Sequence, residues 1–226
     1  MPFVPLTKVK ATRAVEVCKN FVLKEEARPL LSESQTPRDF LEALLANKRY
    51  VAAIDFLAHA LPPREAIWWG CLCLQQVSSS RLPPVEAAAF KAAVQWVLDP
   101  TEEHRRTAQP PGEAAGLGTA AGGLAMATTW TGGSLAPSNP APQAPPIPPV
   151  PPGPFIPAQV VAGAILLAAV KGEPTRIADT QRLFLELGIG VAEGRFVWPE
   201  VKQPPKAPGP EGPEGVGYAA TGGAPH

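Results

Sequence analysis

The sequence has few of the residues that build metal and redox sites. Three cysteines and three histidines occur in 226 residues, and no CxxC or HxxxH pair is present. Cys71 and Cys73 are two residues apart, and since residues at this spacing point roughly 200° from each other on a helix, they cannot share one ion. An odd number of cysteines fits a reducing compartment better than a disulfide framework. We therefore expect buried structural thiols, a cytoplasmic location, and neither a metal site nor a cofactor.

An excess of charge of one sign is also missing. Twenty Lys and Arg balance 20 Asp and Glu, and these charges are dispersed along the chain. A protein that binds nucleic acid usually carries a basic patch or stripe. We therefore expect no nucleic-acid partner.

Long hydrophobic runs are absent as well. The longest, Ala158–Val170, has 13 residues, whereas a membrane-spanning helix needs about 20. No apolar run of the length that signal peptides need, about 7–15 residues, follows Lys8 and Lys10. The sequence thus predicts no membrane span and no signal peptide, and the run at 158–170 indicates a buried helix.

Proline and glycine, in contrast, are abundant and clustered. The chain has 30 prolines and 20 glycines, and 11 of the prolines lie in residues 137–157. Such a segment favours extended polyproline II and cannot bury a core, so it is interpreted as a proline-rich loop or linker. The predicted organisation is a flexible N-terminus (1–10), a helical core (11–136), this loop, a C-terminal helical pair packing on the core (158–196) and a disordered tail (197–226).

No segment of useful length alternates as a β-strand does. Apolar residues at helical spacing, with proline and glycine breaks, predict helices over 11–23, 37–45, 49–60, 63–74, 85–98, 101–108, 119–130, 157–171 and 174–188. The predicted fold class is all-α, as a single irregular helical bundle or a short α-solenoid-like array of about eight or nine helices.

Several residues mark the expected helix ends. Thr36 and Pro37 combine an N-cap with proline at the first helical position, and Thr101 is a second N-cap. Gly172 and Gly188 are predicted C-terminal caps. Two consecutive prolines at Gln109-Pro110-Pro111 should interrupt the helix that Thr101 opens.

The helix at 63–74 is the expected centre of the core because it has almost no polar face. It is predicted to pack against the helices at 40–60 and 85–98. Trp68 and Trp69 differ by about 100° around this helix, and both are predicted to be buried.

Asp55 and His59 are four residues apart on one predicted helix, where their side chains can form a hydrogen bond. A hydrolytic site would need a nucleophile beside them, and none is present locally. A surface helical pair is the favoured interpretation, and no catalytic residue is assigned. A partner contact or pocket formed by Asp55, His59 and Trp69 remains the alternative, although tryptophans at helical spacing are usually core residues.

The glycine-rich stretch Gly116–Gly123 precedes a predicted helix, as phosphate-binding loops do. It matches neither GxGxxG nor GxxxxGK[ST], has no lysine and does not follow a strand. We interpret it as a helix junction with Thr119 as the N-cap, which implies no nucleotide.

Three segments carry a resemblance to a known family: Phe56–Cys71 (FLAHALPPREAIWWGC), Trp96–Arg106 (WVLDPTEEHRR) and Ala114–Pro137. Together they resemble a bacterial family known only as a domain of unknown function, over about residues 11–194. Members of that family are often encoded near type VI secretion components, which implies an accessory or adaptor role. The resemblance implies no catalytic residues. It also implies an uninterrupted alanine-rich helix at residues 109–111, where this chain has two prolines.

The leading functional hypothesis is a non-enzymatic helical interaction protein, an accessory or adaptor whose partner is an unknown protein, with a type VI secretion component as the candidate. The alternative is a small-molecule-binding protein or small enzyme with a pocket around Asp55, His59 and the tryptophan-rich helices. A cavity shared by His59 and Trp69 would favour the alternative, whereas buried tryptophans would speak against it.

Overall fold

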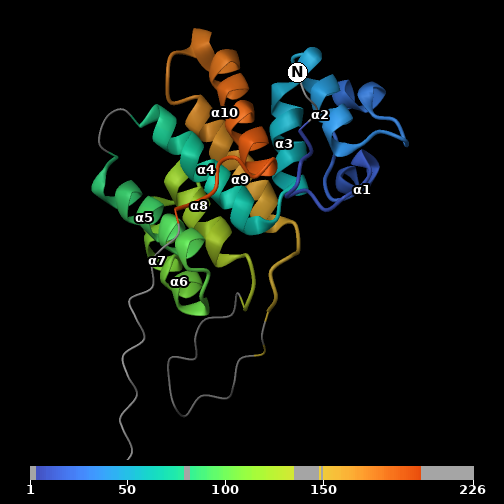
Figure 1. Cartoon of the computed structure of the whole chain (residues 1–226). Coiled ribbons are helices and arrows are strands. Elements are labelled where there is room, and N and C mark those ends of the chain that lie inside the picture. The colour runs from blue at the N-terminus through green and yellow to red at the C-terminus, as the bar shows by residue number, and fades with distance from the viewer. Residues whose placement is uncertain (1–3, 79–81, 135–147, 149, 200–226) are drawn as a thin grey trace, which may run out of the picture.

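The computed structural model describes residues 4–78, 82–134, 148 and 150–199, and within them it contains ten α-helices, two 3₁₀-helices and no strand (Figure 1). The helices pack as one irregular bundle, which confirms the all-α prediction. In chain order they are α1 (Ala14–Cys18), η1 (Glu25–Leu30), α2 (Pro37–Ala46), α3 (Tyr50–Ala60), α4 (Pro63–Val77), α5 (Pro84–Leu98), α6 (Glu102–Thr107), α7 (Gln109–Ala115), α8 (Ala120–Thr129), α9 (Ile156–Ala169), η2 (Pro174–Arg176) and α10 (Ile177–Ala192).

The predicted helix starts are present. Thr36 Oγ1 accepts a hydrogen bond from the Asp39 N–H at 3.2 Å, and the Asp39 carboxylate accepts one from the Thr36 N–H at 3.1 Å, so a capping box opens α2. Thr101 Oγ1 accepts from the His104 N–H at 3.2 Å and caps α6. These side chains bind backbone donors that have no partner inside the helix.

The double proline separates two short helices. α6 ends at Thr107, and α7 begins at Gln109. Pro110 and Pro111 lie in the first turn of α7, where a backbone N–H has no intrahelical acceptor. The predicted interruption is confirmed, and the uninterrupted helix that the family resemblance implied is not formed.

Two predicted helices differ in extent from the observed ones. α1 covers five residues instead of 11–23, and Phe21, which lies beyond its end, stacks on the ring of His59 with centroids 4.5 Å apart. α10 runs from Ile177 to Ala192 instead of 174–188. Gly188 therefore lies inside α10 and is not its cap.

α10 ends at the C-cap residue Glu193, and Gly194 follows it. The φ of Gly194, +79°, lies in the left-handed region, where glycine has no Cβ penalty. The Gly194 N–H donates to the Val191 carbonyl at 2.9 Å, and the Arg195 N–H donates to the Gly190 carbonyl at 2.8 Å. This pair of bonds is the Schellman motif, which ends the helix and turns the chain toward α4.

Helices α4 and α9 form the centre of the bundle. α9 contacts α3, α4, α8 and α10, and α4 contacts α5, α8, α9 and α10. The prediction that α4 is central and packs on α5 agrees with these contacts. The predicted packing of α4 mainly against residues 40–60 was wrong, because α9 and α10 pack on α4 instead. Sequence spacing could not show this, since both helices come about 90 or more residues later in the chain.

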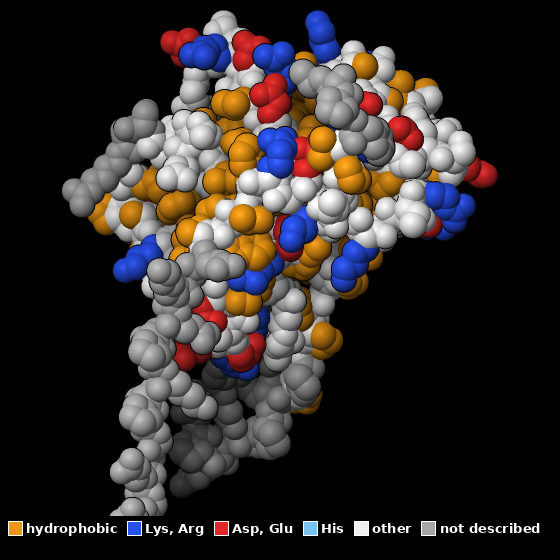
Figure 2. Space-filling view, viewed as in Figure 1, with side chains coloured by type: hydrophobic (Ala, Val, Ile, Leu, Met, Phe, Trp, Pro, Cys, Tyr) orange, Lys and Arg blue, Asp and Glu red, His pale blue; other side chains and the backbone are white. Residues whose placement is uncertain are grey.

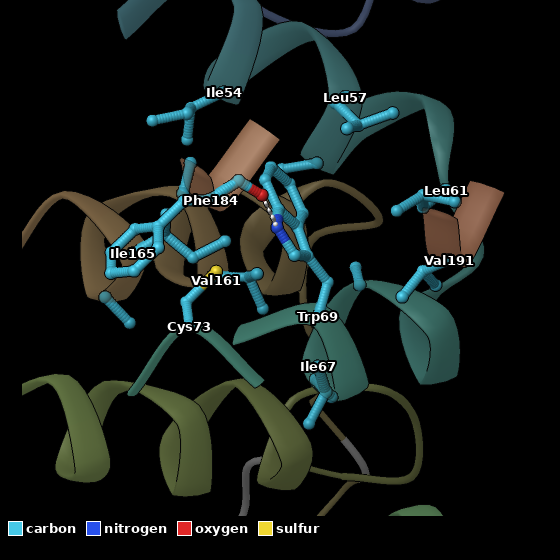
Figure 3. Close-up of a cluster of buried hydrophobic side chains, with 14 of the residues drawn as sticks. Ile54, Leu57, Leu61, Ile67, Trp69, Cys73, Val161, Ile165, Phe184 and Val191 are labelled. Atoms are coloured by element: carbon cyan, nitrogen blue, oxygen red, sulfur yellow. Dashed lines mark hydrogen bonds between the residues drawn. The ribbon is translucent and has the colours of Figure 1, made fainter. Parts of the chain in front are cut away.

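The two adjacent tryptophans of α4 have different surroundings. Trp69 has 0% exposure, and its Nε1–H donates to the Phe184 carbonyl of α10 at 2.7 Å (Figure 3). Trp68 is half-buried, and its Nε1–H donates to the Phe196 carbonyl at 3.1 Å. The prediction that both indoles are buried is thus wrong for Trp68, which the segment after α10 leaves partly exposed.

The two ends of the described chain meet beside α10. The Lys8 N–H donates to the Ala192 carbonyl at 2.9 Å, and Thr7 Oγ1 donates to the Glu193 carbonyl at 3.1 Å. The Glu193 carboxylate, whose side chain is 6% exposed, pairs with Arg38 of α2. The bonds of Thr7 and Lys8 lie in the N-terminal segment (1–10) that was expected to be flexible. The predicted division of the chain into parts stays a prediction, and most of the proline-rich loop and residues 200–226 lie outside the described residues.

An ion-pair cluster ties α6 to the end of α8. The Glu102 carboxylate accepts from Arg105 Nε at 2.7 Å and from Arg106 Nε at 2.7 Å, and the Arg105 guanidinium also donates to the Thr129 carbonyl. The hydrogen bond from Arg105 is the main reason that the pKa of Glu102 is lowered to about 2.

We expect this cluster to make stability pH-dependent. Because the folded-state pKa is lowered, the ionised Glu102 stabilises the fold above its usual pKa, and this contribution is lost as the pH falls from about 4.5 to about 2. The side chain is 55% exposed, so solvent screening leaves only about 1 kcal/mol. Urea unfolding between these pH values should show wild type losing more stability than Glu102→Gln. Equal losses would contradict the assignment.

Candidate functional site

His59 lies near the end of α3 and is held by its own helix. Its Nδ1–H donates to the Asp55 backbone carbonyl at 2.7 Å, so the expected side-chain pair is replaced by a bond to the main chain. Burial lowers the pKa of His59, and the neutral ring then carries its lone pair on Nε2. Burial also raises the pKa of Asp55, an effect that Lys24 and His59 oppose. Both side chains are half-buried, not fully on the surface.

Trp69 does not join His59 in a pocket. Its indole is enclosed by the core and bonded to α10, beside Leu57 and Phe184 in Figure 3. Among the described residues, the pocket at His59 has no tryptophan in its lining. The structure therefore separates Trp69, which belongs to the core, from His59, which lines a pocket nearer the surface and stays bonded to the Asp55 carbonyl.

The His59 pocket, as we call it, has a volume of about 320 Å³. Its polar lining comes from Lys10, Glu16, Asn20 and His59, and its apolar lining includes Val17 and Leu61. His59 Nε2 is buried and has no hydrogen-bond partner among the described residues. Sequence reasoning missed Lys10 and Asn20, because nothing in their spacing relates them to a helix that begins about 30 residues later.

The other chemistry-bearing residues have structural surroundings. Cys71 and Cys73 are buried, and burial raises the pKa of the Cys71 thiol to about 12. Burial likewise raises the pKa of Cys18 to about 11. Thiols with raised pKa values are poor nucleophiles at neutral pH. No group of three or more metal-donor side chains is found within the part of the chain that the structure describes.

The glycine-rich stretch is a helix junction, as predicted. Thr119 Oγ1 accepts a hydrogen bond from the Gly122 N–H at 3.0 Å and caps α8. Gly122 itself packs on the carbonyl of Gly116, so that a Cβ there would collide with backbone. The Gly122 N–H at the start of α8 is therefore already bonded within the junction.

An apolar surface lies where α4 is flanked by α5 and α10. Arg64, near the start of α4, donates to the Val97 and Leu98 carbonyls at the end of α5 at 2.8 and 3.2 Å, so the two helices run antiparallel. Figure 2 shows hydrophobic side chains gathered over these helices. We use the name apolar face for the half-buried or exposed apolar side chains that these three helices carry, which include Trp68, Leu72, Phe90, Val94, Leu183 and Leu187.

The segment after α10 crosses part of the apolar face. The Arg64 guanidinium lies 4.0 Å above the Trp198 ring, a cation–π contact, and Trp68 bonds to the Phe196 carbonyl. Phe196 and Val197 still expose 37% and 57% of their surface, and Leu183 on α10 exposes 42%. Clustered exposed apolar residues of this kind mark interaction surfaces more often than scattered ones do.

Comparison with known proteins assigns the chain to a family but not to an activity. The model of a family described only as a family of unknown function (DUF6931) matches residues 40–192. No curated protein and no solved structure matches the chain. The matched range runs from Phe40 in α2 to the last residue of α10, so it includes the apolar face but not α1 or the N-terminal part of the His59 pocket. No helix among the described residues is long and apolar enough to span a membrane.

Proposed function

The chain belongs to this family of unknown function, and we propose that it is a non-enzymatic helical interaction protein, an accessory or adaptor that works in the bacterial cytoplasm. The proposed partner is a component of a type VI secretion system. Members of the family that the three sequence segments resemble are often encoded beside such components, which supports this choice. The three cysteines, all unpaired, are compatible with a reducing compartment.

The observation that carries this proposal is the apolar face. Leu183 and Leu187 on α10 are one helical turn apart and lie on the same side of that helix. Trp68 on α4 adds an aromatic side chain, and aromatic residues are enriched at protein interfaces. A helix or apolar segment of a partner that covers this surface would remove it from water, which is the main favourable term in protein association.

We expect a charge on the apolar face to abolish partner binding without unfolding the protein. Leu183→Glu places a carboxylate on a side chain that is 42% exposed, so the cost to folding is small but the cost to an apolar interface is large. Val22→Glu is the matched control, since Val22 is 84% exposed and lies between α1 and η1. Tagged wild-type, Leu183→Glu and Val22→Glu proteins are purified from the native host, and the bound proteins are identified by mass spectrometry.

The proposal expects secretion components with wild type and with Val22→Glu, and their loss with Leu183→Glu. Circular dichroism of the three proteins should be alike. Recovery of no secretion component under conditions where the locus is expressed would contradict the adaptor role. Equal recovery with Leu183→Glu would contradict the use of the apolar face.

A further inference from the structure

Residues 196–199, which follow α10 and which we call the strap, lie on part of the apolar face. The Phe196 carbonyl accepts a hydrogen bond from Trp68 Nε1–H at 3.1 Å, and the Trp198 ring lies 4.0 Å from the Arg64 guanidinium. Trp68 and Arg64 both belong to α4. The strap therefore covers the part of the apolar face that α4 contributes near its start.

The side chains of the strap alternate in exposure. Phe196 is 37% exposed and Trp198 is half-buried, whereas Val197 between them is 57% exposed. Such alternation is typical of an extended segment, in which residues two apart share a face. An extended segment of another protein with aromatic side chains at the same spacing can make the same contacts.

Phe196 lies against α10 at a position that has no side chain. Gly190 is buried within α10, and a Cβ on this residue would overlap the Phe196 ring. The missing side chain makes room for an aromatic ring beside the helix. Together with Trp68 and Arg64, Gly190 thus defines a place where α4 and α10 accept two aromatic side chains.

Few interactions oppose detachment of the strap. A hydrogen bond and a cation–π contact at a partly exposed site each contribute little to stability. The Schellman motif at Gly194 ends α10 before the strap begins, so α10 stays wound when the strap leaves. Segments with few buried apolar contacts open at a free energy far below that of global unfolding.

We propose that the strap is an autoinhibitory cover, which opens so that a partner can bind there through an extended segment with aromatic side chains two residues apart. The inference rests on the proposed function, because it takes the apolar face as the partner's binding surface. Leu183 on this face stays 42% exposed while the strap is bound. A partner segment longer than the strap can bury such surface as well, and this extra burial favours displacement.

Hydrogen exchange of two indole groups in the full chain tests whether the strap opens. Trp68 Nε1–H is bonded to the strap, whereas Trp69 Nε1–H is bonded to the Phe184 carbonyl inside the core and serves as the internal control. We expect the Trp68 indole to exchange at least about 100-fold faster than the Trp69 indole. Equal rates for the two indoles would mean that the strap opens only with global unfolding, which would overturn the proposal.

Gly190→Ala links this exchange to the strap. The added methyl group takes the place of the Phe196 ring, so the Trp68 indole should exchange about tenfold faster than in wild type while the Trp69 rate stays the same. Gly163→Ala, where a Cβ meets no neighbour, is the matched control and should leave both rates unchanged. Phe196→Ser has the same expected effect and replaces Gly190→Ala if that variant does not fold. An unchanged Trp68 rate would overturn the proposal.

A peptide with the sequence of residues 193–200, EGRFVWPE, tests whether the covered site accepts a separate segment. It is titrated, with a fluorescent label, into full-length wild type and into full-length Phe196→Ser/Trp198→Ser, the strap variant. We expect the strap variant to bind the peptide about tenfold more tightly or better, because in wild type the bound strap competes. Absence of binding to the strap variant, or equal affinity of the two proteins, would overturn the proposal.

Two controls identify the binding site of the peptide. The peptide EGRSVSPE, which has neither aromatic side chain, should not bind. Adding Gly190→Ala to the strap variant should abolish binding of EGRFVWPE, because the methyl group occupies the place of the phenylalanine ring. Binding that persists in either control would contradict the assignment of the site.

Purification of the strap variant from the native host separates this inference from the adaptor role. Autoinhibition predicts that the strap variant recovers more of the secretion component than wild type does. Equal recovery would overturn autoinhibition and leave the adaptor role intact. If neither protein recovers a secretion component while the exchange and peptide results are as expected, the proposed function fails and the strap remains a cover over a binding site for an aromatic segment.

Discussion

Trp69→Ala should lower the free energy of unfolding by ~3–5 kcal/mol, the range for removing a large aromatic side chain from a packed core. Trp69 is fully buried on the central helix α4, and its indole fills the space between α4 and α10 (Figure 3). The substitution leaves a cavity and also removes the hydrogen bond to the Phe184 carbonyl. Urea unfolding followed by far-ultraviolet circular dichroism measures the change.

Trp68→Ala is the matched control for this experiment. The same side chain is removed from the neighbouring position, but Trp68 is half-buried, so the loss should be only roughly 1–2 kcal/mol. Equal losses for the two variants would mean that both indoles are core residues. A loss below about 1 kcal/mol for Trp69→Ala would contradict the central place of α4 in this fold.

Gly188→Ala should destabilise the protein by about 1–3 kcal/mol through overpacking. A Cβ at this position of α10 would lie 2.5 Å from Trp69 Cε2 and 2.7 Å from Leu57 Cδ2. Both neighbours are fully buried, so neither can move away without disturbing the core. The close approach of α10 to α4 thus depends on the absence of a side chain at residue 188.

Gly163→Ala tests whether this effect is steric. Gly163 lies inside α9, and a Cβ there would meet no atom within 4 Å. Alanine has a higher helix propensity than glycine, so this variant should be more stable than wild type by up to about 1 kcal/mol. Thermal and urea unfolding of both variants provide the comparison. A stabilising Gly188→Ala would contradict the observed packing of Trp69 against α10.

Local signals in the sequence predicted much of the secondary structure. Thr36 with Pro37, Thr101 and the double proline at 110–111 each act within one turn of the chain, and each marks a boundary that the structure contains. Capping and proline effects depend on backbone groups close in sequence, which is why they can be recognised without the fold. The all-α class could be predicted from the helical spacing of apolar residues and the lack of β-alternation.

Features that depend on neighbours distant in sequence were not predictable in this way. Helical spacing alone gives Trp68 and Trp69 similar apolar surroundings, and only the position of α10 distinguishes them. Gly188 is of the residue type that commonly ends helices, but it lies inside α10 opposite Trp69. The glycine that takes the left-handed conformation at the end of α10 is Gly194. The His59 pocket needs Lys10 and Asn20, which the fold brings to α3 across about 40–50 residues of chain.

Site-specific photo-cross-linking in the native host tests the interaction role most directly. A photoreactive phenylalanine analogue replaces Leu183 on the apolar face in one protein and the more exposed Val22 in a control. The adaptor role predicts one discrete adduct from position 183, containing a type VI secretion component, and none from position 22. No adduct from position 183, or the same adduct from both positions, would contradict it.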